Sequence, residues 1–248
     1  MAVFVSVVQS LLLLFIFGTS SAMSGSLPML PAGDRASLSA VGVVRSAGQN
    51  GSTLCSGTLV ARDLVITSAH CIKQNAGLLH NVEFIAGVNG ARFVANSGSV
   101  EVLEHPVWRN TSGIGKYRYD VAIIHLSRPI ALGKVQPIRL FSSGKELPER
   151  GALVGYRGPK AVALHGRLDC TFSSLSNRGL FASDCPASGG NSGGAVLTRG
   201  DNGWELAGII VASRRLTATA VVIELDDWLR TKVSDALLRE AKWGADLK

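Results

Sequence analysis

Residues 64–71 read Leu-Val-Ile-Thr-Ser-Ala-His-Cys, an apolar run that ends at a histidine and a cysteine. Two later segments also set a reactive residue against apolar or glycine neighbours. They read Tyr-Asp-Val-Ala-Ile-Ile at 119–124 and Gly-Asn-Ser-Gly-Gly at 190–194. A serine hydroxyl is a poor nucleophile unless a base lies within hydrogen-bond reach, and that base needs a partner that orients it. The three segments therefore supply a base, an orienting carboxylate and a nucleophile, in that order.

The candidate residues are His70 as base, Asp120 as its orienting carboxylate and Ser192 as nucleophile. His70 differs from the other histidines because a hydrophobic strand leads to it and a cysteine follows it. Asp63 and Asp169 are the alternatives to Asp120. Together the three candidates predict nucleophilic catalysis on a carbonyl substrate.

Short apolar runs recur along the chain with Gly, Asn or Pro between them, and they predict β-strands. The predicted strands cover residues 39–44, 57–61, 64–67, 82–86, 121–126, 153–156, 195–197, 206–212 and 218–225. Many short strands indicate a sandwich or a barrel, and periodicity alone does not choose between them. One helix is predicted from Asp226 or Asp227 to about residue 243. Its apolar face would consist of Trp228, Leu229, Val233, Ala236 and Leu237.

The order of histidine, aspartate and serine in these contexts resembles secreted, bacterial-type trypsin-like serine peptidases over residues 36–243. The Gly-Asn-Ser-Gly pattern is similar to the glutamyl endopeptidase-like group. The resemblance implies an all-β fold of two six-stranded antiparallel β-barrels, with the active site in the cleft between them and a C-terminal helix. It also implies a serine endopeptidase that forms an acyl-enzyme on Ser192, with His70 as general base and acid.

Two other functions are compatible with parts of the pattern. An α/β-hydrolase esterase also carries G-x-S-x-G, but it requires the order serine, aspartate, histidine and a helix after the serine. A non-catalytic binding protein on a peptidase fold would usually have lost a member of the triad, and none is lost here.

The glycines beside the serine allow the backbone N–H groups of Gly190 and Ser192 to point at one spot, where an oxyanion would bind. We call residues 190–194 the serine loop. By resemblance, the pocket for the substrate side chain before the cleaved bond (P1) is built from the segment just before this loop and from the predicted strand near residues 208–213. They are Pro186, Ala187, Ser188, Gly189, Ile210, Val211, Ala212 and Ser213. Trypsin has an acidic residue where Pro186 stands, and glutamyl endopeptidases have a histidine near Ile210. We therefore expect a small or apolar P1 residue, unless Arg214 or Arg215 selects an acidic one.

Trypsin-type enzymes also carry an aspartate directly before the nucleophile, and it pairs with a new N-terminal ammonium on activation. Here that position is Asn191, and no Ile-Val-Gly-Gly sequence occurs. Activity is therefore not expected to depend on this ion pair.

The four cysteines allow three pairings. Cys55 and Cys71 bracket one strand-turn-strand unit, and Cys170 and Cys185 bracket a second unit before the serine motif. We expect these sequential disulfides. A zinc site is the alternative, but no C-x-x-C or H-x-x-H spacing supports one, and we expect neither metal nor cofactor.

Residues 1–22 are expected to be a signal peptide, with an apolar core and small residues before a cleavage site after Ala22. No Lys or Arg precedes Arg35, which departs from the usual pattern, so an uncleaved anchor is the alternative. Residues 23–35 are predicted to be an arm or short propeptide. Removal of residues 23–34 is expected to change activity modestly, unless this segment blocks the cleft. Residues 36–248 would form the peptidase domain.

Export agrees with disulfides, which form in oxidising compartments, so we expect a secreted or periplasmic protein. The apolar run near the N-terminus is short for a membrane span, and no stable span is expected after signal removal. The net charge is +7, but no Lys/Arg block occurs, so nucleic acid is not an expected partner. The expected partner is a protein or peptide substrate, bound by a monomer.

Overall fold

A computed structural model describes residues 25–48, 51–74, 77–78, 82–141, 147–158, 160–176, 179–214, 217 and 219–246. The predicted signal peptide and Arg215 lie outside the described residues. Among the residues described, no helix combines the length and the apolar character needed to cross a membrane.

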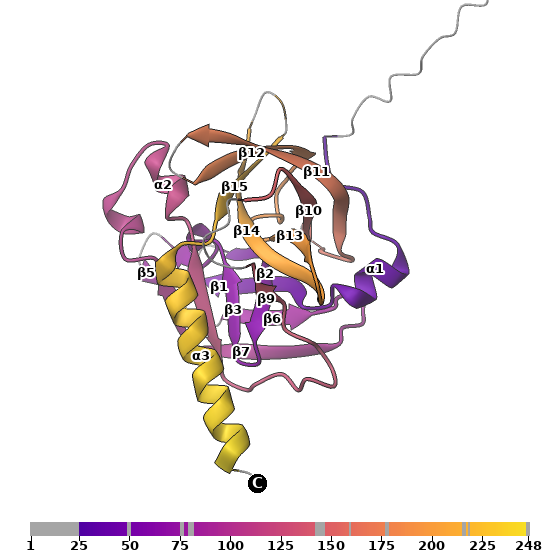
Figure 1. The fold of residues 1–248 in the computed structure, drawn as a ribbon, viewed down its shortest axis with the longest axis vertical. Coiled ribbons are helices and arrows are strands. Elements are labelled where there is room, and N and C mark those ends of the chain that lie inside the picture. The colour runs from indigo at the N-terminus through magenta and orange to yellow at the C-terminus, as the bar shows by residue number, and fades with distance from the viewer. Residues whose placement is uncertain are drawn as a thin grey trace, which may run out of the picture.

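The first barrel closes from six antiparallel strands around the apolar side chains of the N-terminal half (Figure 1). In spatial order the strands are β1 (Val41–Gly48), β2 (Gly51–Ala61), β3 (Leu64–Thr67), β8 (Ala122–Leu126), β7 (Ala95–Glu104) and β6 (Val82–Ala86). Strand β6 pairs back onto β1, which closes the barrel. Leu59, Ile66, Phe84 and Ile124 are fully buried inside its core.

The second barrel is built from the C-terminal half and also closes from six antiparallel strands. They are β13 (Ala195–Gly200), β10 (Arg150–Gly155), β11 (His165–Ser176), β12 (Leu180–Pro186), β15 (Thr219–Glu224) and β14 (Gly203–Ser213). Pairing of β13 with β14 closes it, and β9 (Arg139–Leu140) adds to β14 in parallel. The predicted pair of six-stranded barrels with a C-terminal helix is confirmed.

The C-terminal helix α3 (Asp227–Asp246) extends slightly beyond its predicted end. Asp226 caps it, since its Oδ1 accepts from the backbone N–H of Leu229 at 3.0 Å. Leu229 and Val233 are buried against the barrels, as their spacing predicts. Leu237 was predicted on the same face, but it is half exposed.

Shorter elements connect the strands. They are α1 (Ala32–Ser37), η1 (Ala69–Cys71), β4 (Lys73–Gln74), β5 (Gly77–Leu78), η2 (Trp108–Asn110) and α2 (Gly115–Arg118).

The described part of the N-terminal arm packs onto the second barrel. Met29 forms a β-bridge with His165, and the N–H of Leu30 donates to the oxygen of Leu164 at 3.1 Å. Leu27 is completely buried in the core of that barrel. This part of the arm therefore contributes to the core of the fold.

Candidate active site

The pairing of β3 with β8 brings His70 and Asp120 to the same end of the first barrel. In this pairing Thr67 lies opposite Ala122, so the residues just beyond the strand ends meet. His70 Nδ1 lies 2.6 Å from Asp120 Oδ2, and the backbone N–H of His70 donates to Asp120 Oδ1 at 2.9 Å. The carboxylate is buried, whereas 40% of the His70 side chain is exposed. The carboxylate thus orients the ring, and Nε2 is left free for a proton transfer.

Neither alternative carboxylate is hydrogen-bonded to His70 in the described part of the chain. Asp169 pairs with Arg167 at 3.2 Å on the surface of β11. Asp63 follows β2, and its charge acts on His125.

The serine loop crosses from the second barrel to the first. The N–H of Ser56 in β2 donates to the oxygen of Ser192 at 2.8 Å, and the N–H of Gly193 donates to Ile210 at 2.8 Å. Gly193 has φ +75°, and a Cβ there would overlap the Ser56 carbonyl and the Thr67 hydroxyl. Only glycine fits this close approach, which holds the serine against the barrel that carries His70.

The N–H groups of Gly190 and Ser192 donate to no group in the described residues, and Ser192 Oγ forms no hydrogen bond there either. The carbonyl of Gly189 shares a peptide unit with the N–H of Gly190 and accepts from Gly158 at 3.0 Å. The N–H of Gly190 therefore points the opposite way. These are the two donors that the sequence predicts for an oxyanion.

The predictions from sequence missed Ser56, which links the two barrels. Its hydroxyl donates to the oxygen of Gly190 at 2.8 Å and accepts from the N–H of Tyr156 at 2.7 Å. Its backbone oxygen accepts from the Thr67 hydroxyl at 2.7 Å. The only sequence signal for Ser56 is its place directly after Cys55.

Asn191 holds the serine loop by neutral hydrogen bonds. Its Nδ2 donates to the oxygen of Tyr156 at 2.9 Å, and its Oδ1 accepts from the N–H of Ser188 at 2.8 Å. The side chain is completely buried. Burial also raises the pKa of Tyr156 to about 12, so this neighbour is neutral as well.

The structure contains the disulfides Cys55–Cys71 and Cys170–Cys185. The first joins β2 to η1 and anchors the turn that carries His70. The second joins β11 to β12 just before the serine loop. His70 lies near the first pair of sulfurs, but oxidised sulfurs are not the thiolates that bind metals.

Behind Asp120, a buried histidine connects the barrel to α3. His105 Nε2 lies 3.1 Å from Asp226 Oδ2, and the N–H of His105 donates to the oxygen of Val121. The ring stacks on Tyr119 with centroids 4.9 Å apart. Desolvation by burial lowers the pKa of His105, while Asp226 pulls it upward.

A pocket of about 370 Å³ opens beside Ser192. It is lined by Ala187, Ser188, Gly189, Ser192, Ile210, Ala212, Ser213 and Arg214. Two residues predicted for this pocket do not line it. Pro186 is buried at the end of β12, and Val211 faces the core because side chains alternate along β14.

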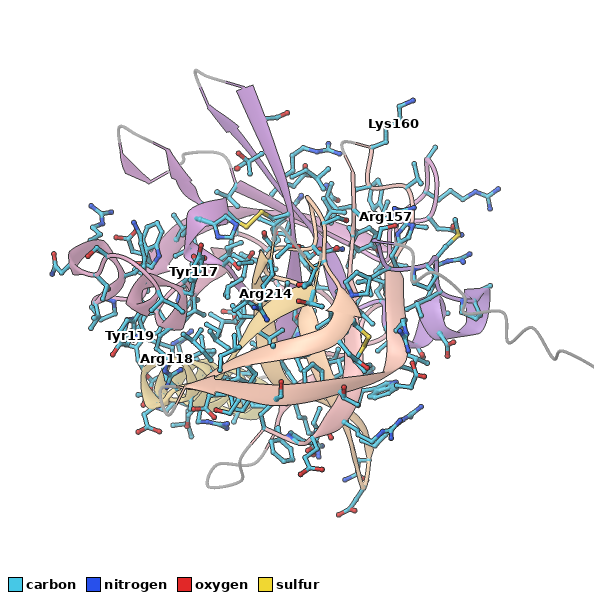
Figure 2. The ribbon with its side chains drawn as sticks, turned by 90° about the horizontal axis from the view of Figure 1, so that it is seen from above. Tyr117, Arg118, Tyr119, Arg157, Lys160 and Arg214 are labelled. Atoms are coloured by element: carbon cyan, nitrogen blue, oxygen red, sulfur yellow. A yellow bond between two sulfur atoms is a disulfide. The ribbon has the colours of Figure 1, made fainter. Side chains whose placement is uncertain are left out.

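Arg214 changes the charge of this pocket. It follows β14, is exposed, and forms no ion pair with any residue that the structure describes. Figure 2 labels it near the centre of the view, between Arg157 and the segment Tyr117–Tyr119. The pocket therefore carries a cation, from one of the two arginines that the sequence offered as candidates to select an acidic P1 residue.

Comparison with known proteins agrees with this geometry. The Trypsin family model matches residues 33–229. A vitellin-degrading protease of Bombyx mori is 28% identical over 100 residues, which are 40% of this chain and 36% of that protein. Chymotrypsin-like elastase family member 3A of Homo sapiens is 33% identical over 119 residues, 46% of this chain and 40% of that protein. The matched stretch thus spans less than half the length of these relatives.

Solved structures share the fold at low identity. A Glu endopeptidase in complex with MPD has a TM-score of 0.70 and 18% identity, covering 86% of this chain and 98% of that one. A thermostable serine protease, AL20, from an extremophilic microorganism has a TM-score of 0.64 and 19% identity, covering 76% of this chain and 92% of that one. The fold is that of the two-barrel serine peptidases. Since the family model matches most of its length, the chain belongs to the trypsin family.

Proposed function

We propose that this protein is a secreted serine endopeptidase that hydrolyses polypeptides through an acyl-enzyme on Ser192. The observation that carries the proposal is the 2.6 Å contact between His70 Nδ1 and buried Asp120, beside a serine loop that is hydrogen-bonded to the same barrel. Residues 1–22 would direct export, and the two disulfides suit an oxidising compartment. The protein would act as a monomer.

In the first step, Ser192 Oγ attacks the carbonyl carbon of the substrate while His70 Nε2 takes the hydroxyl proton. Asp120 keeps Nδ1–H oriented and stabilises the imidazolium. The carbonyl oxygen becomes an oxyanion and accepts hydrogen bonds from the N–H groups of Gly190 and Ser192. The C–N bond then breaks, and His70 gives its proton to the leaving amine.

In the second step, water attacks the acyl-enzyme while His70 takes a proton from it. The ester bond to Ser192 breaks, His70 returns the proton to Oγ, and the acid product leaves. Both steps use the chain's own residues. A binding protein without catalysis is the alternative, but all three triad side chains are present and two of them are in contact.

Turnover of a polypeptide tests the proposal. Ser192→Ala and His70→Ala are each expected to remove nearly all cleavage of a quenched fluorescent casein, because the triad acts as a unit. Asp120→Asn is expected to lose on the order of 10⁴-fold, since it favours the wrong tautomer of His70. Asp63→Asn is the matched control and keeps full activity. A folded Ser192→Ala protein with wild-type turnover would refute the mechanism.

For the P1 residue, we propose a preference for glutamate or aspartate, paired with Arg214. The argument is the Arg214 guanidinium, which pairs with no carboxylate among the described residues and stands among otherwise neutral lining residues. It attracts a carboxylate and repels Lys or Arg. This revises the expectation of a small or apolar P1 residue.

Chromogenic peptides that differ only at P1 test this preference. We expect kcat/KM for Glu to exceed that for Gln by about tenfold, and Arg214→Gln to abolish the difference. Arg150→Gln removes an exposed cation of β10 that does not line the pocket and should leave the ratio unchanged. A preference for Ala or Gln over Glu in the wild-type protein would restore the neutral-pocket expectation.

A further inference from the structure

A second pocket, which the proposed catalysis does not use, lies between α1 and the connection from β6 to β7. Its volume is about 350 Å³. Three cations line it: Arg35 from α1, Arg92 from the β6–β7 connection, and Lys134 from the segment after β8. No carboxylate is among the lining residues that the structure describes.

The three cations lack acidic partners. None of them forms an ion pair with a carboxylate in the part of the chain that the structure describes. Arg35 Nη1 donates to the oxygen of Leu30, while its buried Nε has no acceptor within the described segments. Positive groups that converge without neutralising carboxylates attract an anion.

Apolar side chains line the same pocket. Phe93 is 54% exposed and Val94 is 41% exposed, and both come from the connection that carries Arg92. An inorganic anion would use the charges and leave these side chains in water. A ligand that combines a carboxylate with an apolar group would use both.

The pocket adjoins the segment that supports the serine loop. The N–H of Gly90 donates to the oxygen of Val162 at 2.6 Å, and the Tyr156 hydroxyl donates to the oxygen of Val88, a lining residue, at 3.3 Å. Tyr156 also holds Asn191, next to the serine. The wall of the pocket and the serine loop thus contact the same tyrosine.

We propose that the pocket binds an acidic segment of a polypeptide, outside the site of cleavage. A Glu or Asp side chain lies among Arg35, Arg92 and Lys134, and a neighbouring aromatic or aliphatic side chain packs on Phe93 and Val94. The occupant is a peptide because its successive residues present a charge and an apolar group at the spacing of adjacent side chains.

Binding of a labelled peptide to the full chain tests this site independently of catalysis. The Ser192→Ala variant prevents cleavage, and the probe is a short fluorescein-labelled peptide with three glutamates and one phenylalanine. In this background, Arg92→Glu and Lys134→Glu are each expected to raise Kd by about tenfold, because an attraction becomes a repulsion. Both side chains are exposed, so folding should be unchanged by circular dichroism.

Arg128→Glu is the matched control, since it reverses an exposed charge outside the pocket and should change Kd by less than about twofold. A probe with Gln in place of Glu, and one with Gly in place of Phe, should each bind more weakly. Failure of the probe to bind, or equal weakening by Arg128→Glu, would overturn the site. Undiminished binding of the Gly probe would overturn the peptide assignment in favour of a simple anion site.

Discussion

The hydroxyl of Ser56, a residue of the first barrel, donates to the backbone oxygen of Gly190 in the second barrel at 2.8 Å. The same hydroxyl accepts from the N–H of Tyr156, so a single buried side chain connects two segments of the second barrel. The peptide unit next to the proposed oxyanion donor is thereby fixed from the opposite barrel. Ser56 is therefore a positioning residue for the N–H of Gly190.

Ser56→Ala is expected to lower kcat about tenfold to a hundredfold with little change in KM, because a misplaced donor weakens the transition state more than the bound substrate. Thr58→Val is the control in the same strand, since Thr58 Oγ1 is buried and has no hydrogen-bond partner among the residues that the structure describes. Steady-state kinetics on one peptide substrate distinguishes the two variants. A rise of KM of about tenfold or more in Ser56→Ala, without loss of kcat, would contradict this role.

Gly193→Ala is expected to destabilise the fold by about 3 kcal/mol or more, because the new Cβ overlaps the Ser56 carbonyl and the Thr67 hydroxyl. Gly113→Ala is the matched comparison. Gly113 also has a positive φ, of +61°, but no described residue lies within 4 Å of the added Cβ, so only the backbone cost of about 1–2 kcal/mol remains. Urea unfolding of both variants measures the difference, and equal losses would mean that contact across the barrels is unimportant.

Leu27→Ala in the N-terminal arm is expected to cost about 2–5 kcal/mol, since this side chain is fully buried in the second barrel. Met29→Ala, two residues later and 55% exposed, should cost little. Thermal unfolding of the two variants provides the test. Removal of residues 23–34 would then destabilise the protein, an effect on stability that the sequence analysis did not address. Equal melting temperatures for both variants would restore the view of a dispensable arm.

Stability should fall on acidification because of two buried histidines. Burial lowers the pKa of His105 and of His165 from the ordinary 6.5. Below pH 6.5 the unfolded chain therefore binds protons that the folded chain still excludes, so the free energy of unfolding decreases as pH falls from that value toward the lowered pKa.

We expect a smaller free energy of unfolding at about pH 5.5 than at about pH 7.5, measured by urea titration of tryptophan fluorescence. His165→Asn keeps a donor for the oxygen of Ala163, which accepts from His165 Nδ1 at 2.8 Å, and should reduce this pH dependence. An increase in stability on acidification would show that other groups dominate.

The sequence was informative where local pattern decides structure. Apolar runs predicted β3 and β6 with their observed ends, covered all of β8 with one residue more, and located part of the strands around the serine. Strands β7 and β11 were missed because many of their side chains are polar and at least partly exposed to solvent. Strand β12 was also missed, although it begins with the apolar run Leu-Phe-Ala.

The site was predictable only in its motif residues. His70 and Asp120 stand out by their neighbours in sequence, whereas Ser56 and Arg214 take their roles from pairings between distant segments. The bond from Ser56 to Gly190 spans 134 residues, a separation at which no local pattern exists. Arg214 reaches the pocket because β14 ends there, and the sequence alone left it as one of two candidates.

Covalent labelling of the serine tests the central claim most directly. A fluorophosphonate reagent phosphonylates a serine that an adjacent base has activated, with loss of fluoride. Mass spectrometry should find one adduct per chain, on the peptide that contains Ser192, and no adduct in Ser192→Ala or His70→Ala. A folded wild-type protein that stays unlabelled, or that is labelled equally after loss of His70, would contradict the account.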